Sequence, residues 1–303
     1  MSEFIYRVAG RASLIFNWLH SLFLVGRAKR FQKSGASRFD RTGLIVRKAE
    51  PIAIFWEDDD VLFPNYEMLP YAFARAQEFS LFRLYKSYLT RPLADFGCGD
   101  GSFGSVLFDE IDFGIDNDLD ALAIANDYGI YLKMVESGDN VIPLEDNSVQ
   151  TIMSNSVFEH VDGLETYLEE IRRILKDKGQ IVFTVPLIKF KTDLAKYYGK
   201  RASARLNREA YHRNLYTAQE WKDLLARHGF NVILERQYQP DWFTFWCEIL
   251  RLTGRTGFGL IVPGISMKIR NRYKRQFVEA VRTSIKQTTG GDCAFFIAQK
   301  LPK

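Results

Sequence analysis

Three glycines and two acidic residues have the types and spacing of a nucleotide-type binding site. The glycines alternate with other residues over 97–101, directly after the apolar run 93–96. Glycine has no Cβ and tolerates positive φ, so such a loop lets the backbone approach a ligand closely. Asp95 precedes the first glycine by two residues, and Asp116 follows the loop by about twenty residues, where an acid can bind ribose hydroxyls. The pattern predicts a cofactor that carries a ribose.

The residues that follow the loop distinguish a dinucleotide cofactor from other cofactors that carry a ribose. The loop reads GxGxG rather than GxGxxG, and Gly138-Asp139-Asn140 is followed by the run 142–148, which dinucleotide-dependent dehydrogenases lack. Together with 154–161 and 168–182, these motifs resemble in order those of class I S-adenosyl-L-methionine (SAM) dependent methyltransferases, specifically the type 11-like domain. The resemblance covers about residues 93–238 and a last strand at 293–300.

The resemblance implies that SAM is the cofactor and indicates which residues contact it. In that family an acid at the position of Asp139 meets the adenine amino group, and Asn140 adds a backbone contact. The alternative for Asp95 and Asp116 is a purely structural role in turns, and Cys98 is expected to pack behind the loop without thiol chemistry. The predicted cofactor-binding residues are Asp95, Gly97, Cys98, Gly99, Gly101, Asp116, Asn117, Asp139, Asn140 and Asn155.

Two histidines are the candidate catalytic residues. Methyl transfer from a sulfonium depends mainly on alignment, but an unactivated hydroxyl acceptor also needs a base, for which histidine is suited near neutral pH. His160 and His212 are the candidates; the alternatives are a helix-start residue facing the cofactor for His160 and an exposed surface residue for His212. Glu159-His160 also resembles the end of an ExxEH motif that binds a divalent metal in a related quinone-pathway branch. Because Ser156 stands at its first acidic position, we predict no metal.

The elements that must position these residues alternate between short apolar strands and amphipathic helices, which predicts a Rossmann-like α/β fold with a seven-stranded, mostly parallel sheet and helices on both faces. The predicted strands are 93–96, 111–115, 131–135, 149–154, 179–185, 230–238 and 293–300. The predicted helices are 66–90, 102–108, 119–127, 163–175 and 217–228, with Thr217 as an N-cap and a turn at Asp177-Lys178-Gly179.

The chain divides into an N-terminal helical arm and linker, 1–90, and a methyltransferase domain, 91–303. Within the arm, apolar residues recur at helical spacing over 12–26, and 49–65 is a linker. Two segments, 186–216 and 239–292, are too long to be simple connections. Because both leave the carboxyl ends of strands, where α/β folds bind ligands, we expect them to be lids over the site.

Charge and composition limit the partners. The net charge is only +4, but 1–48, 189–213 and 268–286 are basic, while 109–170 is acidic. Three separated cysteines indicate neither disulfides nor a zinc site. No apolar run reaches the roughly 18–20 residues of a membrane span, and we expect no secretion signal.

The basic, aromatic-bearing segments 12–26 and 242–275 favour contact with an anionic membrane surface. We therefore predict a small-molecule or lipid-linked acceptor, such as a polyprenyl-linked glycan or a quinone precursor, and a cytoplasmic location, peripheral on the inner face of the membrane. The alternative is that these segments pack internally or form a homo-oligomer interface. A nucleic-acid methyltransferase and a SAM-binding or assembly protein without catalysis remain as alternative functions.

Overall fold

The computed structural model describes residues 44–46, 69–138, 140–245, 274–286 and 289–302. The helix predicted at 12–26, the linker at 49–65 and the middle of the second insertion lie outside the described residues. What the sequence predicts for these three segments therefore stays a prediction.

One sheet runs through the molecule with the order β1-β4-β3-β2-β5-β6-β8-β7. Five neighbouring strands, β4 through β6, are parallel, and β8 enters antiparallel between β6 and β7. The bounds are β1 (Leu44–Val46), β2 (Leu93–Phe96), β3 (Ile111–Asp116), β4 (Tyr131–Glu136), β5 (Val149–Asn155), β6 (Leu175–Pro186), β7 (Phe230–Tyr238) and β8 (Cys293–Lys300). The predicted Rossmann-like fold with a mostly parallel sheet is confirmed, and β1 is a further strand, antiparallel to β4.

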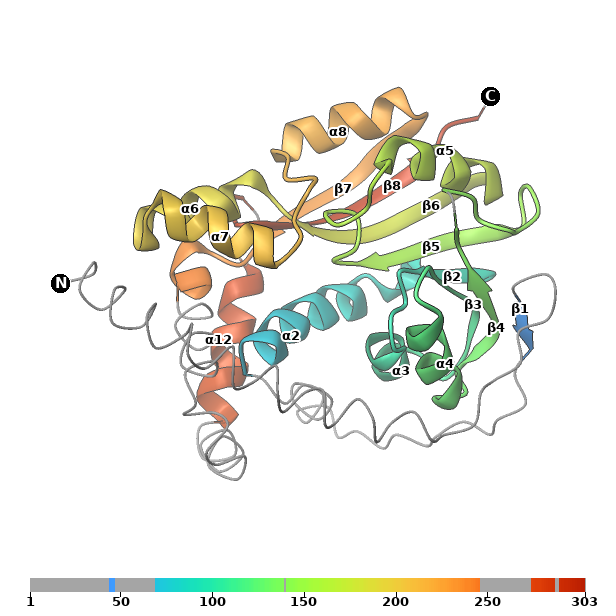
Figure 1. The fold of residues 1–303 in the computed structure, drawn as a ribbon, viewed down its shortest axis with the longest axis horizontal. Helices are drawn as coiled ribbons and strands as arrows, with labels where there is room; N and C mark the ends of the chain where they lie inside the picture. The colour runs from blue at the N-terminus through green and yellow to red at the C-terminus, as the bar shows by residue number, and fades with distance from the viewer. Residues whose placement is uncertain (1–43, 47–68, 139, 246–273, 287–288, 303) are drawn as a thin grey trace.

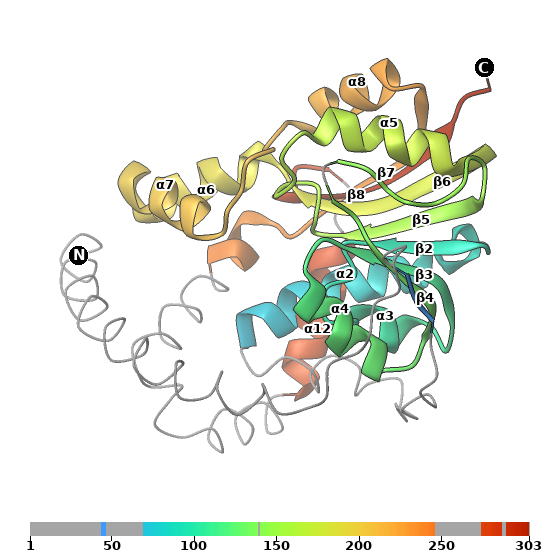
Figure 2. The ribbon, with the colours of Figure 1, turned by 45° about the vertical axis from the view of Figure 1, so that its right-hand side comes forward.

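Helices cover both faces of the sheet (Figures 1 and 2). One face carries α5 (Leu164–Ile174) and α8 (Ala218–Arg227), and the other carries α2 (Leu69–Leu84), α3 (Ser102–Leu107), α4 (Leu119–Asp127) and α12 (Lys274–Lys286). Each face has its own apolar core: Leu168 and Trp221 belong to the first, and Phe82 and Leu122 to the second.

The spacing of apolar residues explains why α5 forms and which side it buries. Its buried positions, Leu164, Tyr167, Leu168, Ile171 and Ile174, recur every three or four residues, and charged residues and one threonine fill the other positions. At α8 the predicted N-cap is confirmed, because Thr217 and Glu220 form a reciprocal capping box.

Two element boundaries differ from the prediction by four residues or more. The helix expected over 66–90 ends at Leu84 and is followed by a short 3-10 helix, η1 (Lys86–Tyr88). Pro92 has no N–H for the Tyr88 carbonyl, which accepts side-chain hydrogen bonds from Thr151 and Gln180 of the sheet instead. The turn expected at 177–179 is an irregular stretch inside β6, which begins at Leu175; Lys178 has a φ of 60° there. The backbone thus passes from α5 into β6 without a separate turn.

The first insertion forms two helices, α6 (Ile188–Tyr198) and α7 (Lys200–Glu209), beyond the carboxyl end of β6. The described start of the second insertion packs against it: the rings of Tyr198 and Phe245 stack at 5.7 Å, and Lys196 pairs with Asp241 at 2.9 Å. The two insertions therefore support each other at this edge of the sheet. Within the described ranges, no helix combines the length and apolar character needed to cross a membrane.

Candidate functional site

The glycine loop turns sharply from β2 into α3. Its three glycines have positive φ, from 53° to 78°. A Cβ on Gly97 would lie 2.4 Å from a methyl carbon of Val157, so the loop after β5 packs directly on this position. At Gly99 a Cβ would meet nothing within 4 Å, and the backbone there faces open space. The loop is therefore closed on one side and open on the other, as a cofactor cradle requires.

Asp116 ties the glycine loop to the end of β3. One carboxylate oxygen accepts the N–H of Gly99 at 2.8 Å, and the other accepts those of Asn117 at 2.8 Å and Asp118 at 3.0 Å. The carbonyl of Asp116 also accepts the N–H of Ser137, which follows β4, at 2.8 Å. One acidic residue thus holds the loops after three neighbouring strands in a fixed relation.

Asp95 lies beneath the loop rather than on its surface. It is 3% exposed, and its carboxyl accepts the hydroxyl of Tyr131 at 2.8 Å. Burial raises the pKa of Asp95 to about 7; the Tyr131 bond opposes this shift, and the charge of Asp116 adds to it. Cys98 is buried, and burial with the neighbouring carboxylates raises the pKa of its thiol. The predicted packing role of Cys98 agrees with this environment.

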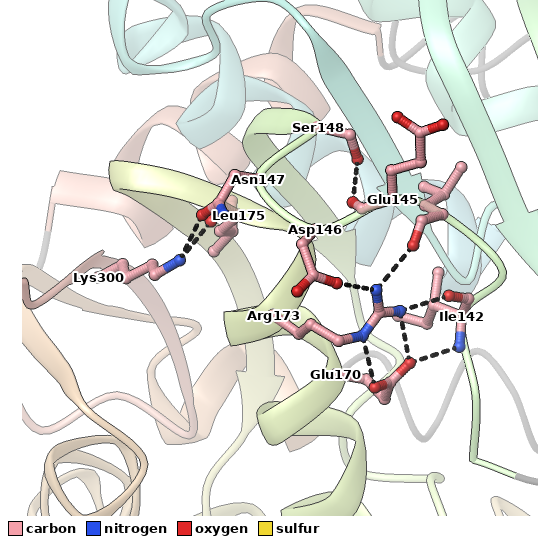
Figure 3. A network of polar contacts seen from close by, with 10 residues as sticks. Ile142, Glu145, Asp146, Asn147, Ser148, Glu170, Arg173, Leu175 and Lys300 are labelled. Atoms are coloured by element: carbon pink, nitrogen blue, oxygen red, sulfur yellow. Dashed lines mark hydrogen bonds and ion pairs between the residues drawn. The ribbon is translucent and has the colours of Figure 1, made fainter. Parts of the chain in front are cut away.

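The segment that resembles the third methyltransferase motif, 142–148, is held by Arg173 of α5 (Figure 3). Its guanidinium donates to the carbonyls of Ile142 and Leu144 and to the Asp146 carboxylate at 2.7–2.8 Å, and it pairs with Glu170. Glu170 in turn accepts the N–H of Ile142.

The residues predicted to meet the adenine lie next to this anchored segment. Asp139 is outside the described residues. Asn140, with a φ of 61°, has its side chain beside Gly163 at the start of α5. The Arg173 network therefore fixes the backbone that follows these two residues.

Asn155 ends β5 and is engaged by a helix that the sequence did not assign to the site. Its amide donates to Glu78 of α2 at 2.9 Å, and its oxygen accepts the Thr184 hydroxyl at 2.7 Å. Glu78 also accepts the Ser156 hydroxyl at 2.9 Å and pairs with Arg75. A glutamate on an amphipathic helix carries no sequence signal for such a role, so α2 was missed as part of the site.

The two candidate catalytic histidines lie side by side. Their ring centroids are 5.4 Å apart, although 52 residues separate them in the chain. The end of the first insertion brings them together, because the N–H groups of Arg213 and Asn214 donate to the Glu159 carbonyl at 2.7 and 3.0 Å. This contact places part of the insertion directly on the loop after β5.

Burial sets the charge states of His160, His212 and the neighbouring Glu159. It lowers the pKa of His160, and it lowers that of His212 to about 4, with the neighbouring His160 contributing to the second shift. Both imidazoles are therefore neutral at pH 7. Burial raises the pKa of Glu159 to about 8, partly offset by its own backbone N–H and by Arg75. The two neutral imidazoles therefore offer nitrogen lone pairs at the carboxyl edge of the sheet, where the glycine loop also lies.

These residues fit SAM by shape and by charge. The open side of the loop at Gly99 leaves room for a ligand against the backbone. Asp100 lies within the loop and Asp116 accepts the N–H of Gly99, so two carboxylates at the loop favour a ligand with a sulfonium and an ammonium group. Asp116 remains the predicted partner of the ribose and Asp139 that of the adenine.

Comparison with known proteins gives a family match and several weaker likenesses. The model of a methyltransferase domain family matches residues 71–235, which is 165 of the 303 residues. An uncharacterized protein of Methanocaldococcus jannaschii is 34% identical over 139 residues, 43% of this chain; the chain spans 57% of the length of that curated relative.

Two solved structures illustrate the weaker likenesses. A SAM-dependent methyltransferase from Thermotoga maritima is 16% identical with a TM-score of 0.48, covering 77% of this chain and 91% of that one. The YcgJ protein of Bacillus subtilis is 14% identical with a TM-score of 0.47, covering 75% and 99%. The family match spans the glycine loop, Asp116, the 142–148 segment and His160 in the loop after β5. The chain therefore belongs to this methyltransferase domain family.

Proposed function

We propose that this enzyme transfers the methyl group of SAM to a hydroxyl oxygen of a small-molecule acceptor. In that reaction the bond from sulfur to the methyl carbon breaks, the acceptor oxygen bonds to the same carbon, and the hydroxyl proton leaves. SAM supplies an electrophilic methyl group when bound, so the protein must align the acceptor and take up one proton.

The histidine pair is the observation that carries the proposal. His160 and His212 present neutral imidazoles beside the loop that follows β5, next to the glycine loop on which Val157 packs. The side chain of His160 is 41% exposed, so a molecule arriving from solvent can reach it. An amine acceptor that is already deprotonated would need no such base, which is why the pair favours oxygen as the methylated atom.

Lipid-linked glycans and prenyl or quinone-type precursors are the acceptors that we favour. Trp242 is 40% exposed on the segment that follows β7, beside the basic and aromatic end of α6. An exposed indole, one residue from the Asp241 carboxylate that Lys196 pairs with, suits a membrane interface. In contrast, Phe243 is 3% exposed, so part of this aromatic segment packs internally. On this proposal the enzyme works peripherally on a membrane surface.

The proposal is tested with methyl-labelled SAM and a panel of hydroxyl, amine and carbon acceptors, water-soluble or lipid-linked in anionic vesicles. Mass spectrometry identifies the methylated atom. We expect O-methyl products, and we expect His160→Ala and His212→Ala each to lower kcat by about 100-fold or more, with the Kd for SAM unchanged.

His228→Ala is the matched control, because His228 also lies near a glutamate, Glu165, but stands at the end of α8 and is not part of the Glu159, His160 and His212 group. Its kcat should equal that of the wild type. Products methylated only on nitrogen or carbon, or full activity of both histidine variants, would refute the proposal. Labelling of nucleic acid instead would favour a nucleic-acid methyltransferase, and SAM binding without transfer to any acceptor would favour a binding or assembly role.

A further inference from the structure

Glu159, His160 and His212 bring three metal-binding atoms close together. One ligand atom from each residue lies within 4.8 Å of the other two. The Nε2 atom of His160 and the Oε1 atom of Glu159 are 3.6 Å apart. Two ligands about 2.1 Å from a common cation at a tetrahedral angle are about 3.4 Å apart, so this pair is already near a binding distance.

Each imidazole has one nitrogen committed to the protein and the other available. Nδ1 of His160 lies 3.3 Å from the Tyr211 carbonyl, which can only accept, so this nitrogen carries the proton. Nδ1 of His212 lies 2.9 Å from the side-chain oxygen of Asn207, whose amide nitrogen donates to the Ser203 carbonyl. Both rings therefore hold their Nε2 lone pairs free, in the way that outer hydrogen bonds orient histidine ligands of metals.

Glu159 provides the observation that points to a ligand independently of the histidines. Its side chain is 2% exposed, and its Oε2 atom has no hydrogen-bond partner within the described part of the chain. A buried carboxyl oxygen without a partner is unfavourable unless a cation or donor meets it. The hydroxyl of Ser156, three residues earlier, donates to Glu78 instead and offers nothing to Glu159.

The backbone holds these ligands in place without a metal. Besides the two N–H groups that the Glu159 carbonyl accepts, the Asn214 amide donates to the carbonyls of Phe158 at 2.8 Å and Val161 at 2.7 Å. The insertion that carries His212 is thus fastened to the loop that carries the other two residues. Such a preformed arrangement lowers the conformational cost of binding.

We propose that Glu159, His160 and His212 form a binding site for a divalent transition-metal cation. Two imidazoles and one carboxylate are the ligand set of three-ligand zinc sites that keep a fourth position open, so Zn²⁺ is the best match. The third ligand comes from the insertion, 52 residues from the histidine that ends the β5 loop. This explains why the sequence pattern, which has Ser156 in place of an acid, predicted no metal.

The site bears on the proposed function but does not rest on it. With a cation bound, both imidazoles are ligands and are not available as bases. Metal binding is therefore measured with neither SAM nor an acceptor present, so its failure would leave O-methylation by the bare histidine pair standing. In the same way, a failure to find O-methylation would leave a measured metal site standing.

The test is titration of the chelator-treated full chain with Co²⁺, followed by visible absorption, and with Zn²⁺, followed by calorimetry. We expect one equivalent of either cation per chain and the absorption of a four-coordinate cobalt site. His212→Ala and Glu159→Gln should weaken binding at least about 100-fold, and Asn207→Ala, which keeps the ring but removes its support, about 10- to 100-fold.

His228→Ala is the matched control and should bind both cations as the wild type does. Unchanged affinity for SAM and an unchanged circular dichroism spectrum show that each variant is folded. The proposal is overturned if the wild type binds neither cation, or if folded His212→Ala binds them as tightly as the wild type.

Discussion

The buried carboxyl of Asp95 makes the stability of the protein depend on pH. Its pKa is about 7 in the folded chain, against an ordinary value of 3.8. Folding thus favours the protonated form, so this group costs no stability below about pH 4. The cost grows as the pH rises from about 4 to 7, because the unfolded chain loses the proton first.

Replacement of Asp95 by asparagine should remove this dependence and keep an oxygen that accepts the Tyr131 hydroxyl. We expect Asp95→Asn to gain stability relative to the wild type as the pH rises, by up to about 4 kcal/mol above pH 7. Urea unfolding of both proteins at several pH values measures the difference. Comparison of the two proteins cancels the similar contribution of Glu159. A difference that does not change with pH would contradict this account.

Individual site residues could be predicted only where a local pattern encodes them. The alternation of glycines around Gly99 and the acid at Asp116 are local, and the structure brings them together through a hydrogen bond. The contact of Glu78 with Asn155 and that of His160 with His212 depend on how distant elements pack. No spacing rule within one segment contains that information.

At the scale of elements, Arg173 is the side chain that joins α5 to the 142–148 segment (Figure 3). Replacement by methionine keeps the aliphatic packing but removes the guanidinium that donates to the Ile142 and Leu144 carbonyls and, among the described residues, leaves Glu170 with only the Ile142 N–H. We expect Arg173→Met to lower the free energy of unfolding by about 2–3 kcal/mol, measured by urea denaturation.

Arg172→Met is the matched control, since Arg172 occupies the next position of α5 but makes one long hydrogen bond, 3.4 Å, to the Leu301 carbonyl. Its effect should stay below about 1 kcal/mol. Equal losses in the two variants would show that the network does not stabilise the segment beyond ordinary helix contacts.

The strands were predicted closely because short apolar runs bounded by turn residues leave few choices for where a strand begins and ends. β2, β7 and β8 have the predicted bounds. The larger errors lie where distant segments make contact. The chain beyond α2 contacts the sheet, where the Tyr88 carbonyl accepts side-chain hydrogen bonds, and β6 begins early because Leu175 pairs with Val149. The short β1 carries no turn or alternation signal, and among the described strands it pairs with β4 alone, at the edge of the sheet.

At the scale of the whole molecule, the carboxyl edge of the sheet gathers the parts of the site. The loops after β2, β3 and β4 meet at Asp116, and the loop after β5 meets α2 and the first insertion. Parallel strand order alone predicts that the loops share one edge. From the sequence, α2 was assigned to the N-terminal arm. Only the packed structure shows that α2 joins these loops, through Glu78.

Calorimetric titration with SAM tests the central claim most directly, on the wild type, on Asp116→Ala and on Asp118→Ala. Asp118 caps α4 by accepting two backbone N–H groups, so its loss should cost about 1 kcal/mol of stability without touching the glycine loop. We predict that the wild type and Asp118→Ala bind SAM alike, and that Asp116→Ala binds at least about 100-fold more weakly, because the loop and the ribose lose one carboxylate. Absence of binding by folded wild type, or equal binding by Asp116→Ala, would contradict the account.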